Sequence, residues 1–482
     1  MTSSSSASAS SLPLYQEVAD KLARLIQEGV LRPGEKIPSL RKVSGQYGVS
    51  LTTAIQAFIQ LEDRGLVEGR PKSGFFVRVQ PKPIKEPAFQ RQPAASSITQ
   101  VSVGGLQSRL FDAAMVPRIL PLGGAVPVPE LLPMVKLNRS LAAVARRQGK
   151  SGVAYDMPPG SEVLRREIVK RTLNAGATLL PQEVITTCGA TEALMLCLRA
   201  VTQPGSVVAV ESPAYFGALH ALEELGLRAV EIPTDPEHGM DLDALEVALT
   251  QHDISACLVV PNFSNPTGSL MPDAHKRSLV QMLAEREVPL IEDDVFGELH
   301  HGPHRPHLAK SYDEKGLVML CGSFSKSLAP GYRVGWVAPG RYYDRIKALK
   351  LTTTLATPTL PELAIADFLA NGGYDHYLRS ARAFYAANTK RVGQAIRLAF
   401  PEGTQVSQPQ GGFVLWVEMP TGVDALRLQD EALAHEINIA PGPMFSANQG
   451  YRNCVRISCG VPWTERLHHA LQTLGKLAAR QM

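Results

Sequence analysis

After residue 108, short apolar segments alternate with helical segments along the chain. Five of the apolar segments predict strands, at 206–210, 256–260, 289–293, 317–321 and 335–339. Short apolar runs of this kind are typical of parallel strands that are buried on both faces. Helical patterns lie between them, for example at 190–201 and 275–288, so the chain repeats a βαβ unit. This alternation predicts an α/β fold with a mostly parallel sheet.

A stretch rich in proline and small polar residues, 80–108, divides the chain of 482 residues. It contains four prolines and shows no apolar periodicity, which is typical of a linker. We therefore expect one compact unit over 13–79 and a larger one over 109–482. Residues 1–12 form a Ser/Ala-rich tail that we expect to be disordered. The tail lacks the basic and apolar regions of a secretory signal, so we do not expect it to be one.

The composition excludes several classes of protein. Hydrophobic residues make up 44% of the chain and charged residues 20%, which is ordinary for a globular protein. No apolar run reaches the roughly 18 residues of a membrane span, so we expect a cytoplasmic protein without a membrane partner. The six cysteines include no C-x-x-C pair, which favours reduced thiols over a disulfide or metal framework.

The net charge of +4 comes from the first part of the chain, because residues 13–108 contain 13 Lys or Arg and 8 Asp or Glu. This excess hints at a partner that carries phosphates. The same part predicts helices over 15–29, from Ser39 and from Ser50. That is helix-turn-helix spacing. The hydroxyls of Ser50, Thr52 and Thr53 can donate to the phosphates or base edges of DNA.

The segments PLYQEVADKLARLI, PGEKIPSLRKV, YGVSLTTAIQAF and GLVEGRPKSGFFV resemble the winged helix-turn-helix domain of GntR-type bacterial transcription regulators over 13–79. The resemblance implies double-stranded DNA as the partner, with contacts from Arg41, Ser50, Thr52 and the wing residues Lys72 and Gly74. Two positions depart from the pattern. Leu51 stands where arginine is frequent, and Ile55 or Gln56 fills a second basic position, so base contacts are fewer or different.

The strongest chemical signal is CGSFSKSLAPGYRVGW at 321–336, where Lys326 follows an apolar segment. The hydroxyls of Ser323 and Ser325 and the guanidinium of Arg333 are phosphate ligands around this amine. An amine that is desolvated beside a guanidinium has a lowered pKa, which a lysine needs to attack an aldehyde and form a Schiff base. The aldehyde implied is pyridoxal 5'-phosphate.

Other residues supply the remaining groups that this chemistry needs. Asp293, at the end of a predicted strand, offers the carboxylate that keeps the pyridine nitrogen protonated. Asn265 can donate to the phenolate oxygen, and Tyr215 is placed to stack on the ring. The amides of a small-residue loop at 189–191 can hold a phosphate at a helix N-terminus. We expect Glu292 and Asp294, beside Asp293, to be solvated or structural.

Order and spacing resemble the fold type I aminotransferases over 110–480, and the whole chain resembles the MocR subfamily of GntR regulators. The resemblance implies a Schiff base at Lys326, with Asp293 at the ring nitrogen, Asn265 at the phenolate oxygen and Tyr215 on the ring. It also implies phosphate ligands and a substrate pocket. The phosphate ligands are Ala190, Thr191, Ser323, Ser325, Arg333 and, from the other subunit of a homodimer, Tyr155. The substrate residues are Arg456, which receives an α-carboxylate, and Gly124 and Ala125.

One departure concerns Phe296, since the family frequently has a tyrosine three residues after the ring-nitrogen aspartate. Two hypotheses stay open. In the first, the protein is a transcription regulator that binds an operator and senses an amine or amino acid through the bound cofactor. In the second, it is an active aminotransferase of amino acids with a tethered DNA-binding domain.

Overall fold

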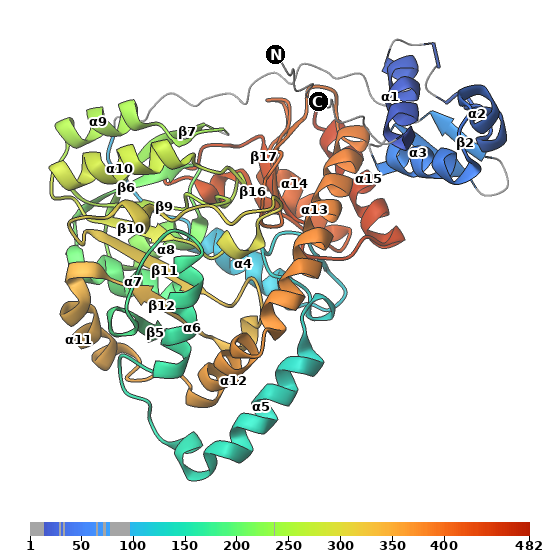
Figure 1. Ribbon diagram of the computed structural model, residues 1–482. Helices are drawn as coiled ribbons and strands as arrows, with labels where there is room; N and C mark the ends of the chain where they lie inside the picture. The colour runs from blue at the N-terminus through green and yellow to red at the C-terminus, as the bar shows by residue number, and fades with distance from the viewer. Residues whose placement is uncertain are drawn as a thin grey trace, which may run out of the picture. The chain divides into compact units, whose positions relative to one another are not determined.

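The computed structural model describes residues 14–27, 30–31, 34–63, 66–70, 74–77, 97–235 and 237–482. The chain divides into two compact units, Met1–Ala88 and Phe89–Met482 (Figure 1). The expected tail, the wing residue Lys72 and residues 80–96 of the expected linker lie outside the described residues.

The first unit contains α1 (Leu14–Gln27), α2 (Leu40–Tyr47), α3 (Leu51–Asp63) and a hairpin of β1 (Val67–Arg70) and β2 (Gly74–Val77). Ser39 caps α2 by accepting a hydrogen bond from the Lys42 N–H, and Gly48 ends it in the left-handed conformation with φ of 65°. Ser50 caps α3 by accepting from the Thr53 N–H at 3.0 Å. The helices predicted from Ser39 and Ser50 are thus confirmed, because their capping residues stand where the sequence places them.

The core of the first unit is built from one face of each helix and from the hairpin. It includes Val18, Leu22, Val43, Phe58 and Leu61. The ring of Phe58 packs edge-on against Phe75 of β2, with ring centres 5.0 Å apart. β1 and β2 pair antiparallel, with Arg70 opposite Gly74. This antiparallel pair lies where the resemblance to a winged helix-turn-helix domain implies the wing.

A nine-stranded sheet forms the centre of the second unit. Its strands are β3 (Thr99–Gln100), β5 (Ile185–Thr187), β6 (Val207–Ser212), β7 (Arg228–Asp235), β8 (Gly239–Met240), β9 (Ile254–Val259), β10 (Leu290–Asp293), β11 (Val318–Ser323) and β12 (Gly335–Ala338). Their order is β3-β7-β6-β9-β10-β11-β12-β5, and β8 pairs with β7. The strands from β7 to β11 in this order are parallel, whereas β3, β8 and β12 run antiparallel to their neighbours.

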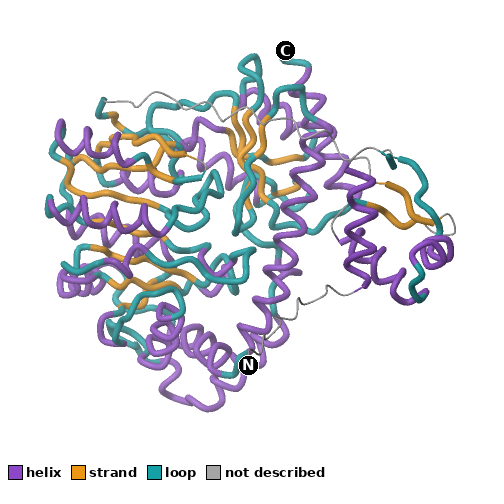
Figure 2. The backbone as a smooth tube through the Cα atoms, turned by 45° about the horizontal axis from the view of Figure 1, so that its top comes forward, coloured by secondary structure: helices purple, strands orange, loops and turns teal. Residues whose placement is uncertain are grey.

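Helices cover both faces of this sheet (Figure 2). α7 (Ala190–Val201), α8 (Phe216–Glu224) and α11 (Tyr343–Thr353) pack on one face, and α9 (Leu242–Gln251) and α10 (Asp273–Glu285) on the other. In β6, Val208 and Val210 join the first cluster, while Val207 and Ala209 join the second. Since strand side chains alternate between faces, both faces of β6 are buried. The predicted α/β layers are confirmed.

β12 departs from the expectation of a parallel strand at 335–339. It pairs antiparallel with β11, with Ser323 opposite Gly335. The connection between the two strands, 324–334, contains no α-helix. A parallel connection needs a crossover of a dozen or more residues, usually a helix, so this short connection returns the chain antiparallel.

A second, antiparallel sheet has the order β13-β14-β17-β16. Its strands are β13 (Gln405–Val406), β14 (Val414–Glu418), β17 (Cys454–Ser458) and β16 (Ala440–Pro441). It shares a hydrophobic core with α13 (Gly373–Ala399), α14 (Ala425–Ala434) and α15 (Glu465–Ala479). The remaining α-helices and strands are α4 (Gly104–Ala114), α5 (Met134–Gln148), α6 (Glu162–Leu173), α12 (Thr359–Ala370) and the parallel pair β4 (Leu120–Pro121) and β15 (Ile437–Asn438).

The last residues of the expected linker have regular structure. β3 pairs with β7, and α4 begins at Gly104. Val101 and Val103 are buried, which explains why this short polar-looking stretch is held against the large sheet. Among the described residues, no helix combines the length and the apolar character that crossing a membrane requires.

We predict that Gly335→Ala destabilises the protein, because β12 passes very close to the N-terminus of α7. A Cβ at Gly335 would lie 2.5 Å from the Gly189 carbonyl carbon and 2.8 Å from the Ala190 nitrogen, both backbone atoms. Such overpacking costs about 1–3 kcal/mol, which urea denaturation measures. Gly331→Ala is the control, since a Cβ there meets no atom within 4 Å. Equal stability of the two variants would contradict the close approach.

Candidate functional site

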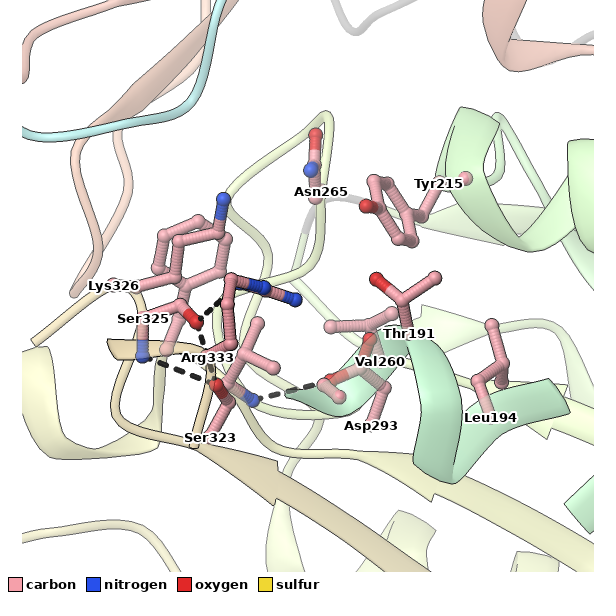
Figure 3. Close-up of a pocket in the computed structure, with 14 residues that line it drawn as sticks. Thr191, Leu194, Tyr215, Val260, Asn265, Asp293, Ser323, Ser325, Lys326 and Arg333 are labelled. Carbon is pink, nitrogen blue, oxygen red and sulfur yellow. Dashed lines mark hydrogen bonds between the residues drawn. The ribbon is translucent and has the colours of Figure 1, made fainter. Parts of the chain in front are cut away.

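A pocket lies where parallel strands of the large sheet end (Figure 3). Asp293 is the last residue of β10, Ser323 is the last residue of β11, and Val260 follows β9. The carboxyl edge of a parallel sheet is where α/β proteins bind ligands. The pocket brings together the predicted residues Ala190, Thr191, Tyr215, Asn265, Asp293, Ser323, Ser325, Lys326 and Arg333.

Asp293 is a buried acid at the floor of this pocket. Its carboxylate accepts a hydrogen bond from the Val295 N–H at 3.2 Å. Burial raises the pKa of Asp293 to about 7, against the opposing attraction of the Lys326 ammonium. A buried carboxylate is stabilised when a cationic or strongly donating group lies against it, so this position suits a protonated ring nitrogen.

Lys326 lies on the loop after β11, and its Nζ donates to the Ala125 carbonyl at 2.7 Å. Burial lowers the pKa of Lys326 to about 8, and the positive charges of Arg456 and Arg333 lower it further while Asp293 opposes the change. A considerable fraction of this amine is therefore neutral near physiological pH. A neutral, desolvated amine is a nucleophile for aldehydes.

Hydroxyls, a guanidinium and a helix N-terminus form an anion site beside Lys326. Ser323 Oγ accepts from the Ser325 N–H at 3.0 Å and donates to Ser325 Oγ at 2.9 Å. Arg333 donates to Ser325 Oγ at 3.2 Å and to the Cys188 carbonyl at 3.1 Å. Gly189, with φ of 86°, precedes α7. Free amides at a helix N-terminus attract phosphate, and Arg333 adds a full charge.

Arg456 of β17 is fully buried, which excludes a surface ion pair. Its Nη1 donates to Asn265 Oδ1 at 2.8 Å, its Nη2 donates to the Gly123 carbonyl, and its Nε has no hydrogen-bond partner. The rings of Phe216 and Phe445 lie 5.3 and 5.1 Å from the guanidinium carbon. Burial lowers the pKa of Arg456 to about 10. Only neutral oxygens accept from it among the described residues, so a ligand carboxylate would be its natural counter-ion.

The remaining predicted site residues lie next to Lys326, in the pocket wall or outside the pocket. Ala125 contacts Lys326 through its carbonyl, and Gly124 lies between this residue and Gly123, which contacts Arg456. Tyr155 is 77% exposed and does not line the pocket. Tyr215 lines the pocket directly before α8, and burial raises its pKa to about 12.

The two acids beside Asp293 are structural, which is one of the two alternatives expected for them, and both are buried rather than solvated. Glu292 is fully buried and accepts from the N–H groups of Ala309 and Lys310, each at 2.8 Å. Asp294 accepts from Asn262 at 2.9 Å and from Arg305 at 2.5 Å. Phe296 is fully buried against Phe413, with ring centres 5.3 Å apart, and also lines the pocket.

Sequence reasoning missed Gly123 and Glu211. Glu211 of β6 accepts from the Val260 N–H at 2.8 Å, while its Oε1 is buried without a partner. Burial raises the pKa of Glu211 to about 8, and nearby Asp293 raises it further. The sequence pattern that could have identified Glu211 is an acid inside an otherwise apolar strand. The role of Gly123 depends on its contact with Arg456, which lies far away in the sequence, so no local pattern predicts it.

A buried ion pair stabilises the loop and the start of α7 that contribute to the anion site. Lys350 of α11 lies 3.1 Å from Glu192 of α7, and both side chains are buried. Glu192 also accepts from the Cys188 N–H at 2.5 Å. Cys188 is thus held through its N–H by Glu192 and through its carbonyl by Arg333. Lys350 neutralises the Glu192 carboxylate, which would otherwise repel an anion at the start of α7.

We predict that Lys350→Met destabilises the protein by about 3–5 kcal/mol, because it leaves the Glu192 carboxylate buried without its cation. Denaturant unfolding measures the loss. Lys347→Met, a lysine that is partly exposed on the same helix, is the control and should be close to neutral. A small effect of Lys350→Met would mean that the pair does not hold this region.

The predicted DNA-contacting residues within the described part of the chain lie on α2, at the start of α3 and in β2. Arg41 is exposed on α2 and Thr52 is exposed on α3. Ser50 Oγ and Thr53 Oγ1 lie 2.8 Å apart and hydrogen-bond to each other, so both hydroxyls already serve the cap of α3. Gly74 begins β2 with φ of 97°, a conformation that favours glycine.

Two family models match the chain. The model described as "Aminotransferase class I and II" matches residues 134–474, and the model described as "Bacterial regulatory proteins, gntR family" matches residues 14–77. Among curated relatives, an HTH-type transcriptional regulator of Escherichia coli K12, YdcR, itself uncharacterised, is 39% identical, covering 97% of this chain and 99% of its own. The 2-aminoadipate transaminase of Thermus thermophilus is 32% identical, covering 76% of this chain and 92% of its own.

Solved structures agree with the fold. The α-aminoadipate aminotransferase LysN of Thermus thermophilus, crystallised with N-(5'-phosphopyridoxyl)-L-leucine, superposes with a TM-score of 0.72 at 30% identity. The match covers 78% of this chain and 96% of LysN. The chain therefore belongs to the GntR-type bacterial regulators of the MocR arrangement, in which a helix-turn-helix domain is joined to an aminotransferase class I and II domain.

Proposed function

We propose that this regulator binds pyridoxal 5'-phosphate in the pocket around Lys326 and senses an amino acid or amine there. One observation carries the proposal. Arg456 is a buried guanidinium without a carboxylate partner among the described residues, and it donates a hydrogen bond to Asn265, which lines the same pocket. The donor set fits the cofactor. The ring nitrogen requires a buried acid, the aldehyde requires an amine that can lose its proton, and the phosphate requires an anion site; the pocket has all three.

Each proposed contact uses a group whose position supports the role. Asp293 would lie at the ring nitrogen and Tyr215 against the ring. Asn265 would donate through its amide nitrogen to the phenolate oxygen, and its Oδ1 accepts from Arg456 until a ligand carboxylate takes the guanidinium. Thr191, Ser323, Ser325, Arg333 and the Ala190 N–H would hold the phosphate. The backbone of Gly124 and Ala125 would border the ligand.

When bound, pyridoxal 5'-phosphate supplies an aldehyde for reversible covalent capture of an amine and a ring that accepts electrons. The chain's own residues then orient the ligand. Arg456 would bind a carboxylate through the two ends of its guanidinium fork, which favours amino acids over simple amines. Lys326 Nζ, with a pKa of about 8, can hold or release a proton within the pocket near neutral pH.

Working transamination is the second candidate function, and the likeness to a 2-aminoadipate transaminase favours it. Absorption spectra of the purified protein during titration with amino acids, with and without a keto acid acceptor, distinguish the two. A lasting band shift without keto product supports a sensor. Steady formation of keto product supports an aminotransferase with a tethered DNA-binding domain. Absence of any band of the bound cofactor would contradict both.

A homodimer in the cytoplasm is part of the proposal. Tyr155 is 77% exposed, and Val153, two residues before it, is 89% exposed, so this segment is available to a second copy. Tyr155 would complete the phosphate site of the other subunit. Two helix-turn-helix domains per dimer would then bind two half-sites of an operator on double-stranded DNA.

We predict that Lys326→Ala abolishes the covalent link to pyridoxal 5'-phosphate that borohydride reduction makes permanent. Mass spectrometry of the denatured protein detects the link, and Lys347→Ala should keep it. In the unaltered protein, the rate of capture should rise with pH through about 8, because only the neutral amine attacks and its pKa is lowered to about 8. A rise centred near the usual value of 10.5, or a link that survives in Lys326→Ala, would contradict the assignment.

We predict that Arg41→Ala weakens binding to a duplex from the region upstream of the protein's own gene. Loss of one phosphate contact lowers the slope of log affinity against log salt by about 1, which fluorescence anisotropy at several salt concentrations measures. Arg24→Ala, an exposed arginine of α1, is the control and should change neither quantity. Unchanged binding by Arg41→Ala would remove Arg41 from the DNA interface.

A further inference from the structure

The helix that would enter DNA, α3, is apolar on two faces. Its inner face is buried in the core through Ala54, Phe58 and Leu61. A second stripe with the spacing i, i+4, i+8 points away from that core: Leu51 is 45% exposed, Ile55 39% and Ile59 50%. The outer face of a surface helix is normally polar, and an aliphatic stripe along it is typical of a face that binds a partner.

The surroundings of this stripe indicate nucleic acid as the partner. From Ser39 to Gln60, the only charged residues are Arg41 and Lys42, both positive and both exposed. The stripe begins in the first turn of α3, beside the exposed hydroxyl of Thr52. In helix-turn-helix proteins, the N-terminal residues of the second helix of the motif contact base edges in the major groove, while neighbouring positive charges contact phosphates.

The chemistry of the stripe limits what it can read. Leu51 and Ile55 have no donor or acceptor, so they cannot recognise guanine, cytosine or adenine by hydrogen bonds. The apolar group that base pairs present in the major groove is the 5-methyl of thymine. Gln56, exposed beside Ile55, has the amide that pairs with N6 and N7 of adenine. Both features select A·T pairs.

We propose, on the basis of the DNA-binding function above, that Leu51 and Ile55 read thymine methyl groups and that the operator half-site is centred on A·T pairs. The aliphatic side chains replace arginine–guanine hydrogen bonds by contact with methyl groups that leave water on binding. Ile59 lies about 12 Å along the helix from Leu51 and is outside this contact.

The test uses the full-length protein with pyridoxal 5'-phosphate and a library of random-sequence DNA duplexes. Rounds of selection give the enriched half-site, which should contain A·T pairs. Each thymine of that duplex is then replaced by deoxyuridine, which removes only the methyl group. We expect a loss of about fourfold in affinity for each methyl group that Leu51 or Ile55 covers, the value of burying one such group.

Variants locate the contact. Leu51→Ala and Ile55→Ala should each bind the thymine duplex more weakly and should each lose sensitivity to one deoxyuridine position. Ile59→Ala is the matched control and should keep the full sensitivity. Alanine is the best helix former, so exposed substitutions on α3 leave the fold intact, which circular dichroism checks.

Several results would overturn the proposal. One is equal affinity for every deoxyuridine duplex, and another is unchanged methyl sensitivity in both Leu51→Ala and Ile55→Ala. A change of oligomeric state in Leu51→Ala would assign the stripe to a protein partner instead. If the library yields no enriched sequence, DNA recognition itself fails, whereas an enriched site without methyl sensitivity overturns only the reading by Leu51 and Ile55.

Discussion

The hydrogen bonds of Arg456 join three parts of the second unit at one point. The guanidinium extends from β17 of the small sheet, Asn265 follows β9 of the large sheet, and Gly123 follows β4. A buried charge is costly unless it is paired, and here the acceptors are an amide and a carbonyl oxygen. The small sheet is therefore held at the pocket by an interaction that a carboxylate could improve.

This arrangement relates ligand binding to conformation in the proposed sensor. A ligand shifts an equilibrium only as far as its affinities for the two states differ. A carboxylate that pairs with Arg456 would compete for the guanidinium with Asn265 and Gly123, and so would favour a different placement of the small sheet. Coupling energies between such sites are typically about 1–3 kcal/mol. A coupling energy in that range changes operator affinity by a factor of about 5 to about 150.

Much of the pocket could be predicted from the sequence, because its residues carry local signals. Asp293 and Ser323 each end an apolar strand, and strand ends meet at one edge of a parallel sheet. The remainder depends on residues far apart in the chain. Gly123 has its role only because Arg456 lies against it, and Glu192 only because Lys350 does. The direction of β12 follows from the short connection before it, and the pattern of apolar residues that predicts a strand does not give its direction.

The charge of the helix-turn-helix motif has a consequence for regulation. Affinity for DNA without sequence preference comes mainly from phosphate contacts, and residues 39–60 provide Arg41 and Lys42 for them, so further contacts have to come from positive residues outside the motif, such as Lys72 of the wing. In the proposed dimer, binding is tightest when both domains reach their half-sites together. The gain from a second linked contact depends on the geometry of the link. A ligand that alters the shape of the second unit could thus change operator affinity without touching the residues that read DNA.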